Sequence, residues 1–209
     1  TDPIAPIALA ASGMTAEDDP AIATIERSLE MALASVLRSA KAQIAAGAKA
    51  IIVCEPAANI VFLSPRQLKR NMGIFERLVL EPNRALCALL AEHGTDMIFH
   101  DCGELIDDMV RLFSSELRPV MMSLGASRKL WEDAALVSPD IVLFGNLPTK
   151  TFYSDSAMPE EKVRELTREL ATNMRACGHA HILGSECDVL HVPEAAETIR
   201  HKVDVVMEA

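Results

Sequence analysis

The stretch Met97-Ile98-Phe99-His100-Asp101-Cys102-Gly103 joins a short apolar run to a histidine, a cysteine and a glycine. An apolar run of this length that ends at a turn residue is typical of a buried strand. Successive side chains of a strand point to opposite faces, so His100 and Cys102 would project to the same side at its C-terminal end. The stretch therefore predicts a strand that brings an imidazole and a thiol to one place.

Similar apolar runs recur along the chain and are separated by segments with helical spacing. The runs with strand character are 6–11, 50–54, 97–100, 119–124, 141–144 and 182–183. The helical patterns are 21–46, 64–82, 84–92, 104–117, 128–136, 159–177 and 193–207. Alternating strands and helices predict an α/β fold with a parallel sheet, either an open doubly wound sheet or a (β/α)8 barrel.

The composition excludes several classes of protein. The 209 residues, half of them hydrophobic, suit one globular domain over 1–209. A net charge of -10 without a basic run argues against binding to nucleic acid. No apolar stretch is long enough to span a bilayer. The five cysteines have no regular spacing, so we expect reduced thiols in a cytoplasmic protein.

A third soft metal ligand is available far downstream, because Cys187 follows the predicted strand 182–183. One imidazole and two thiolates are ligands that Zn²⁺ prefers, and a catalytic zinc site usually has three protein ligands and one open position. The C-terminal ends of strands are also where α/β barrels place their active sites. Spacing alone leaves a second interpretation open, in which a buried cysteine and a hydrogen-bonded histidine end a strand.

Two other polar residues at predicted strand ends are candidate catalytic residues. Glu55 follows the run 50–54, and Asn146 lies in the turn Gly145-Asn146-Leu147. Glu55 would face the catalytic end of a barrel, but it could equally cap its strand. Asn146 could hydrogen-bond a substrate or form the turn. No glycine-rich phosphate-binding motif follows any strand, so the sequence does not support nucleotide binding.

The motifs His100-Asp101-Cys102-Gly103 and Gly145-Asn146-Leu147, together with the late Cys187, resemble the uroporphyrinogen decarboxylase superfamily. The HxC motif and the late cysteine are similar to its corrinoid-dependent methyltransferases, of the methylcobalamin:coenzyme M methyltransferase type. Uroporphyrinogen decarboxylases themselves lack the HxC pair. The resemblance implies a (β/α)8 TIM-barrel-like fold, of which this chain would form the last six βα units. The family's N-terminal part would then be absent, so we expect an N-terminally truncated chain.

The resemblance also implies a function. It implies a zinc ion at the C-terminal mouth of the barrel, held by His100, Cys102 and Cys187. Such an ion would bind an acceptor thiol as its thiolate, which takes a methyl group from the cobalt of a methylated corrinoid. The corrinoid would be free cobalamin or part of a corrinoid protein, and some relatives use a tetrahydrofolate acceptor. Coordination would matter because a free thiol, with a pKa of about 8.5, is mostly protonated at pH 7.

The sequence departs from the family pattern at a possible fourth metal ligand. Many relatives carry an acidic residue after the strand that matches 119–124, whereas Gly125 and Ala126 stand here. Glu55 and then Glu186 are the candidate substitutes. The absent N-terminal part lines the substrate pocket in relatives, so the sequence does not identify the acceptor.

Two other functions stay open. A decarboxylase acting on a porphyrinogen-like or other small acid would need basic groups to bind carboxylates, and Arg66, Arg128 and Lys150 are the basic residues near predicted strand ends. A non-catalytic domain that binds a corrinoid or a partner is the other alternative. Its unpaired strand edges would favour association into a homo-oligomer.

Overall fold

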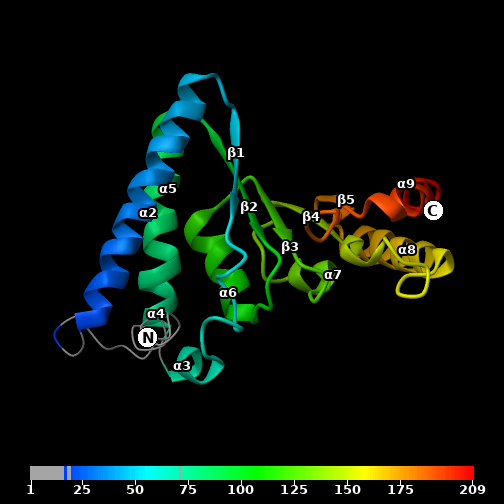
Figure 1. Ribbon diagram of the computed structural model, residues 1–209, viewed down its shortest axis with the longest axis horizontal. Coiled ribbons are helices and arrows are strands. Elements are labelled where there is room, and N and C mark those ends of the chain that lie inside the picture. Colours follow the sequence, from blue (N-terminus) through cyan, green and yellow to red (C-terminus); the bar gives the residue numbers. More distant parts are fainter. Residues whose placement is uncertain (1–16, 18–19, 71) are drawn as a thin grey trace. The chain divides into compact units, whose positions relative to one another are not determined.

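The computed structural model describes residues 17, 20–70 and 72–209 (Figure 1). It divides into two compact units: the first contains the chain up to Ile52 and residues 57–97, and the second contains residues 53–56 and 98–209. The predicted strand 6–11 lies outside the described residues. The organisation of 1–209 as one domain stays a prediction.

The strands form a single sheet with the order β1-β2-β3-β4-β5. They are β1 (Ala50–Cys54), β2 (Asp96–Asp101), β3 (Met121–Leu124), β4 (Val142–Leu147) and β5 (His181–Ser185). From β2 to β5, neighbouring strands pair in parallel. Helical segments connect successive strands, as parallel pairing requires. The predicted α/β fold is therefore confirmed.

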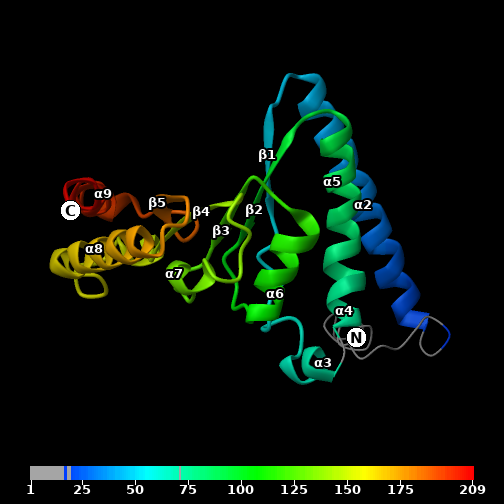
Figure 2. The same cartoon turned by 180° about the vertical axis from the view of Figure 1, so that it is seen from behind.

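In the first unit, the long helix α2 (Pro20–Ala45) and α5 (Glu81–Glu92) lie side by side (Figures 1 and 2). Shorter segments precede α5, namely α3 (Pro65–Arg70), α4 (Gly73–Phe75) and the π-helical turn η1 (Glu76–Leu80). The sequence pattern breaks at Pro82, between the predicted helices 64–82 and 84–92, and this predicted break is wrong, because Pro82 lies in the first turn of α5. A proline lacks the N–H that would bond the preceding turn, and the wider π turn before it accommodates its ring.

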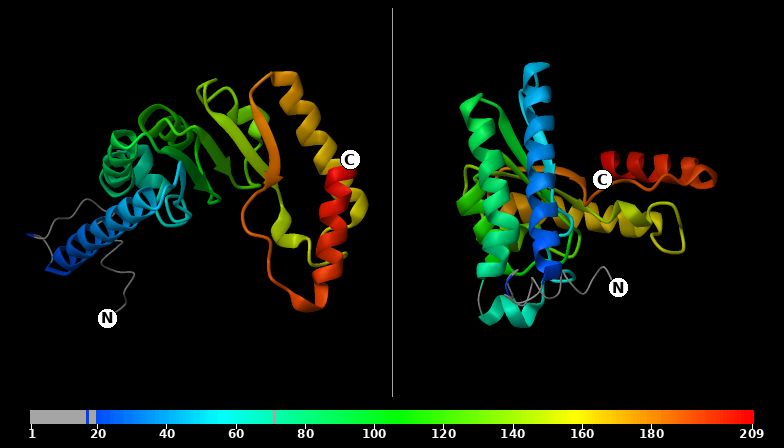
Figure 3. Two further views of the ribbon diagram at one scale, coloured as in Figure 1. Left: turned by 90° about the horizontal axis from the view of Figure 1, so that it is seen from above. Right: turned by 60° about the vertical axis from the view of Figure 1, so that its left-hand side comes forward.

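The second unit holds the remaining helices. They are α6 (Asp107–Leu112), η2 (Phe113–Leu117), α7 (Leu130–Asp133), η3 (Thr149–Thr151), α8 (Glu160–Cys177), η4 (Pro193–Ala195) and α9 (Ala196–Glu208). Helix α8 starts after Pro159 with two acidic residues and ends at Gly178, whose φ is 69°. Acids favour a helix N-terminus, and glycine adopts the left-handed conformation that ends a helix at low cost. Figure 3 shows α8 and α9 side by side.

Two groups of buried apolar side chains hold the second unit together. Phe99 of β2 packs against Phe113 of η2, with ring centroids 4.5 Å apart. A second cluster joins α8 and α9 to the loop between β4 and α8; its buried members are Phe152, Met158, Val163 and Val205. The first cluster thus lies beside β2, and the second packs the segment that follows β4 against α8 and α9. No described helix is both long enough and apolar enough to cross a membrane.

Candidate metal centre

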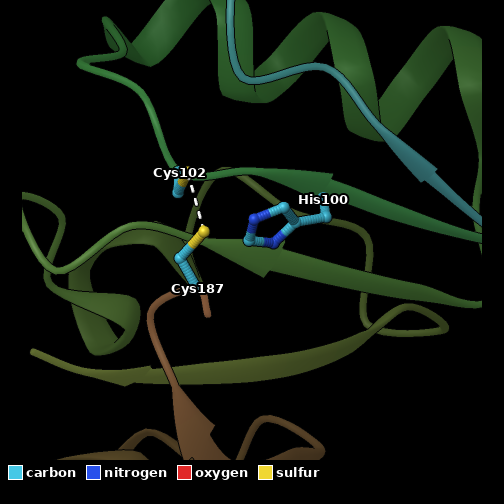
Figure 4. A group of neighbouring side chains, drawn as sticks. All are labelled: His100, Cys102 and Cys187. Atoms are coloured by element: carbon cyan, nitrogen blue, oxygen red, sulfur yellow. Dashed lines mark hydrogen bonds between the residues drawn. The ribbon is translucent and has the colours of Figure 1, made fainter. Parts of the chain in front are cut away.

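The second unit brings together the three predicted metal ligands His100, Cys102 and Cys187, which we call the sulfur–imidazole cluster (Figure 4). Their ligand atoms all lie within 4.8 Å of one another, and the two Sγ atoms are 3.4 Å apart. Ligand atoms around a tetrahedral zinc ion stand roughly 3.5–3.8 Å apart, given bond lengths of about 2.0–2.3 Å. The cluster thus has the dimensions of a zinc site before any ion is placed in it.

Strand pairing fixes the imidazole of the cluster. His100 on β2 is the register partner of Ser123 on β3, and its Nδ1 lies 2.9 Å from Ser123 Oγ. When Nδ1–H donates to this hydroxyl, the Nε2 lone pair is available to a metal ion. Burial lowers the pKa of His100, as does the charge of Lys150, against an opposing effect of Asp188. The imidazole is therefore kept in its neutral, ligating form.

A tight turn presents the Cys102 thiol. Asp101 is buried on the opposite face of β2, and its Oδ1 accepts a 2.8 Å hydrogen bond from the Gly103 N–H. Burial raises the pKa of Asp101 to about 7, and the Glu55 charge adds to this effect. The loop after β3 approaches the same turn so closely that a Cβ on Gly125 would lie 2.6 Å from the Cys102 carbonyl oxygen. Position 125, where many relatives would supply an acidic fourth metal ligand, therefore requires glycine in this chain.

The two thiols share their surroundings with one ammonium group. Burial, and then the neighbouring Cys187, raise the pKa of Cys102 to about 11, whereas Lys150 opposes the rise. Burial by itself lowers the pKa of Lys150, but Cys102, Glu186 and Cys187 together hold it above its ordinary value. The Cys102 thiol would thus stay protonated without a metal ion, because burial and the neighbouring Cys187 both disfavour its thiolate.

The other predicted residues lie near the cluster but outside the ligand group. Glu55 donates its backbone N–H to the His100 carbonyl, and its side chain is partly buried. Glu186 accepts a 3.3 Å hydrogen bond from the Ala126 N–H, so it holds a loop. Neither carboxylate belongs to the group of three ligands. A catalytic role for Glu55 stays a prediction.

Asn146 is buried and ties the loop after β3 to β4. Its Nδ2 donates to the carbonyl oxygens of Gly125 and Arg128, at 2.7 and 2.8 Å. Both amide hydrogens are thus used within the protein. A substrate contact by Asn146 stays a prediction, and the structure gives the residue a second role in fixing this loop.

The same loop carries an ion-pair network, which we call the arginine–aspartate cluster and define as Arg128, Asp107 and Asp133. Arg128 contacts both carboxylates and donates to the Leu105 carbonyl at 3.1 Å. Its side chain is only 15% exposed, and that of Asp133 is 1% exposed. The helical pattern over 128–136 favours an ordinary helix-surface position for Arg128, and this prediction is wrong. Sequence reasoning missed it because ion pairs between loops leave no periodic signal.

Sequence reasoning also missed Ser123 and the electrostatic interaction between Lys150 and the thiols. Ser123 is a polar residue inside an apolar strand, two positions before Gly125, and that departure was a usable signal. Lys150 had no such signal, because the influence of the two thiols on it depends on the tertiary structure.

The model of the uroporphyrinogen decarboxylase (URO-D) family matches residues 19–209 of this chain. No curated protein is similar enough in sequence to match it. A solved methyltransferase from Methanosarcina mazei superposes with a TM-score of 0.64 at 15% sequence identity, over 88% of this chain and 49% of that one. The chain thus spans about half the length of that protein. At this identity the likeness concerns the fold alone, and it supports part of a (β/α)8 barrel.

Proposed function

Since the chain belongs to the uroporphyrinogen decarboxylase family, as its motifs led us to expect, we propose that it is a zinc-dependent methyltransferase. It moves a methyl group between a methylated corrinoid and a thiol or tetrahydrofolate-type acceptor. The corrinoid is free cobalamin or the cofactor of a partner protein. The observation that carries the proposal is the convergence of His100, Cys102 and Cys187 at the ends of β2 and β5.

The three side chains fit a zinc site better than they fit the alternative, in which a buried cysteine and a hydrogen-bonded histidine only end a strand. Two sulfurs and one imidazole nitrogen within 4.8 Å match the ligand types and spacing of a three-ligand site. Ser123 orients the imidazole through Nδ1, as an outer hydrogen-bond partner does in metal sites. Two thiolates and a neutral imidazole would balance the charge of Zn²⁺ and leave its fourth coordination position open to an acceptor sulfur.

Zinc, when bound, supplies the positive charge that converts an acceptor thiol into a thiolate at neutral pH. The protein's own residues hold and orient this site. Asp101 holds the Gly103 N–H next to Cys102, Gly125 allows its loop to lie close to the Cys102 carbonyl, and Asn146 fixes that loop. A preorganised site of this kind would hold an acceptor sulfur in a fixed position, and positioning is a large part of group-transfer catalysis.

The test supplies zinc-loaded protein with methylcobalamin and, in separate reactions, a small thiol or tetrahydrofolate. Mass spectrometry of the acceptor then detects the added methyl group. We expect methylation of one acceptor, and we expect Cys187→Ala to abolish it. The matched control is Cys177→Ala, which removes an exposed thiol at the end of α8. Zinc-loaded protein that methylates neither acceptor would contradict the proposal.

A decarboxylase is the second candidate, and the name of the matching family favours it. It requires basic groups that are free to bind a substrate carboxylate. Of the three predicted basic residues, Arg128 and Lys150 lie in the second unit. Arg128 is occupied by Asp107 and Asp133, which leaves Lys150 as the candidate cation there. Release of CO2 from a small acid by metal-free protein would support this function over methyl transfer. Corrinoid binding without either reaction would support a non-catalytic domain.

A further inference from the structure

We propose that Cys102 and Cys187 form a reversible disulfide when no metal ion occupies the sulfur–imidazole cluster, so that this pair is a redox-sensitive modification site that controls zinc binding. The starting observation is the contact between the two sulfurs, because the Cys102 thiol donates a hydrogen bond to Cys187 Sγ over 3.4 Å (Figure 4). Formation of the disulfide depends on the chain's own residues, whereas its consequence for zinc rests on the proposed function and deepens it.

The two thiols meet two requirements for oxidation to a disulfide. They are close, since an S–S bond is about 2.05 Å long and the sulfurs need to approach each other by about 1.4 Å. They can also be reached by a small oxidant, because both residues are partly exposed. An accessible cysteine with a second cysteine beside it is the usual arrangement in redox-sensing proteins.

A short loop after β3 holds the two cysteine-bearing segments next to each other. Gly125 lies against the Cys102 backbone, where an added Cβ would be 2.6 Å from the Cys102 carbonyl oxygen. The next residue, Ala126, donates its N–H to the Glu186 carboxylate at 3.3 Å, and Glu186 immediately precedes Cys187. The loop therefore contacts both of the segments whose thiols meet.

Strand pairing and a buried side chain fix this arrangement from the other side. The Glu186 N–H donates to the Leu147 carbonyl at 2.8 Å, which extends the pairing of β4 and β5 to the residue before Cys187. The buried Asn146 donates its Nδ2 to the Gly125 carbonyl at 2.7 Å and so ties the loop to β4. These contacts involve no cysteine side chain. The protein itself thus holds the sulfurs together, and removal of a metal ion would not separate them.

A peroxide is a sufficient oxidant for this pair. One sulfur attacks a peroxide oxygen, the O–O bond breaks, and the sulfur becomes a sulfenic acid while hydroxide leaves and is protonated to water. The second sulfur then attacks the sulfenic sulfur, so that the S–S bond forms, the S–O bond breaks and a second water leaves. Two electrons and two protons pass from the thiols to hydrogen peroxide. Whichever sulfur reacts first, its partner is 3.4 Å away, and this proximity favours the second step.

The disulfide would remove two of the three metal ligands. The thiolate is the form of cysteine that binds a metal ion, and a disulfide sulfur carries no negative charge. His100 would be left as a single ligand, which is too few for a zinc site. A dithiol reductant restores both thiols by exchange. Zinc binding and the disulfide therefore exclude each other, and methyl transfer would stop in the oxidised protein.

The test treats the metal-free chain, without air, with an equimolar amount of hydrogen peroxide. Peptide mapping without reduction identifies cross-linked cysteines, and a thiol titration in denaturant counts the free ones. We expect a Cys102–Cys187 cross-link and a fall from five free thiols per chain to three. The rate should not depend on protein concentration, because both sulfurs belong to one chain. The oxidised chain should lose its zinc uptake in equilibrium dialysis, and a dithiol reductant should restore it.

Two variants separate this pair from the other thiols. Cys187→Ser leaves Cys102 without its partner sulfur, so the cross-link should be lost and dimedone should trap a sulfenic acid on Cys102. Cys177→Ala is the matched control, because it removes an exposed thiol at the end of α8. It should form the Cys102–Cys187 cross-link as the unaltered protein does.

The outcomes separate this inference from the proposed function. If Cys102 and Cys187 end as separate oxidised thiols, or cross-link to other cysteines, the inference is overturned and the proposed function stays in place. A cross-linked chain that still takes up zinc also overturns it. A chain that forms the cross-link but binds no zinc when reduced contradicts the proposed function, while the disulfide stands. If Cys187→Ser does not fold, the cross-link map of the unaltered protein decides.

Discussion

The sulfur–imidazole cluster and the arginine–aspartate cluster lie in the same unit, and both follow the C-terminal ends of strands, yet their polar atoms are used differently. Arg128 directs its guanidinium to Asp107, Asp133 and the Leu105 carbonyl, so its donors are used within the protein. In the other cluster the two thiols have each other as neighbours at 3.4 Å, and an imidazole faces them.

This difference separates a structural role from a chemical one. An ion pair that is closed on itself stabilises a loop and offers nothing to a ligand. Sulfur and nitrogen atoms that converge and interact only weakly with one another can still bind a metal ion. The two clusters meet at one loop, since Asn146 bonds the carbonyls of Gly125 and Arg128. The arginine–aspartate cluster therefore supports the loop against which the sulfur–imidazole cluster is built.

The largest effect is expected on the zinc content of the protein, which should depend on the sulfur–imidazole cluster and not on the arginine–aspartate cluster. Cys187→Ala should reduce bound zinc from about one ion per chain to almost none, because two protein ligands hold zinc poorly. The urea midpoint of the metal-free protein should hardly change, since Cys187 is only partly buried. Elemental analysis of protein purified without a chelator measures the zinc, with Cys177→Ala as the control. Equal zinc in both variants would contradict the role of Cys187 as a ligand.

The reverse pattern is expected for Arg128→Met. Removing one partner of a buried ion pair costs about 3 kcal/mol, so the free energy of unfolding should fall by that amount while the zinc ligands stay in place. Urea unfolding measures the loss. Arg111→Met is the control, because the Arg111–Asp108 pair is exposed and should contribute less than about 1 kcal/mol. If Arg128→Met lowered the free energy of unfolding as little as Arg111→Met does, the distinction between the two clusters would be lost.

The pH dependence of the same variant gives a sharper form of that prediction. Burial raises the pKa of Asp133, and Arg128 opposes the rise. Without Arg128 this pKa should rise further, and a carboxyl whose folded pKa is raised loses stabilisation as the pH increases through it. The deficit of Arg128→Met in free energy of unfolding should therefore be larger at pH 8 than at pH 4. A deficit that shrinks with rising pH would show that Asp133 is not the group left without a partner.

A smaller effect is expected at the hydrogen bond that orients the imidazole. Ser123→Ala removes the partner of His100 Nδ1 and should weaken zinc binding by about 10- to 100-fold, as such outer contacts usually do. Competition with a chromophoric chelator measures the affinity. Ser127→Ala, at an exposed position in the following loop, is the control. Unchanged affinity in Ser123→Ala would mean that the strands alone orient His100.

The smallest effect is expected on the surface of α8. The bond to His201, and then the bond to Arg164, lower the pKa of the exposed Glu160. A lowered carboxyl pKa gives stabilisation that is present above the unfolded value and disappears as the pH falls through the folded one. Glu160→Gln should therefore be slightly less stable than the unaltered protein at pH 7 and equal to it at pH 3, by urea midpoint. A difference that persists at pH 3 would assign the effect to something other than charge.

Several elements could be predicted from the sequence because their signals are local. Apolar runs of strand length gave β2 and β4, and a proline followed by acids gave the start of α8. The π turn before Pro82 was not predictable, since the pattern there fits a helix break equally well. Residue spacing also placed His100 and Cys102 on one face of a strand, because alternation is a property of the backbone.

What the sequence determined by itself is the α/β fold and the identity of the soft side chains, since both follow from periodicity and residue chemistry. Tertiary structure alone decided that Cys187, 85 residues beyond Cys102, lies 3.4 Å from it. It also decided that Ser123 orients His100 and that Arg128 is closed within an ion-pair network. These pairings join residues far apart in the chain, and their geometry depends on strand register and loop packing, which no short segment specifies.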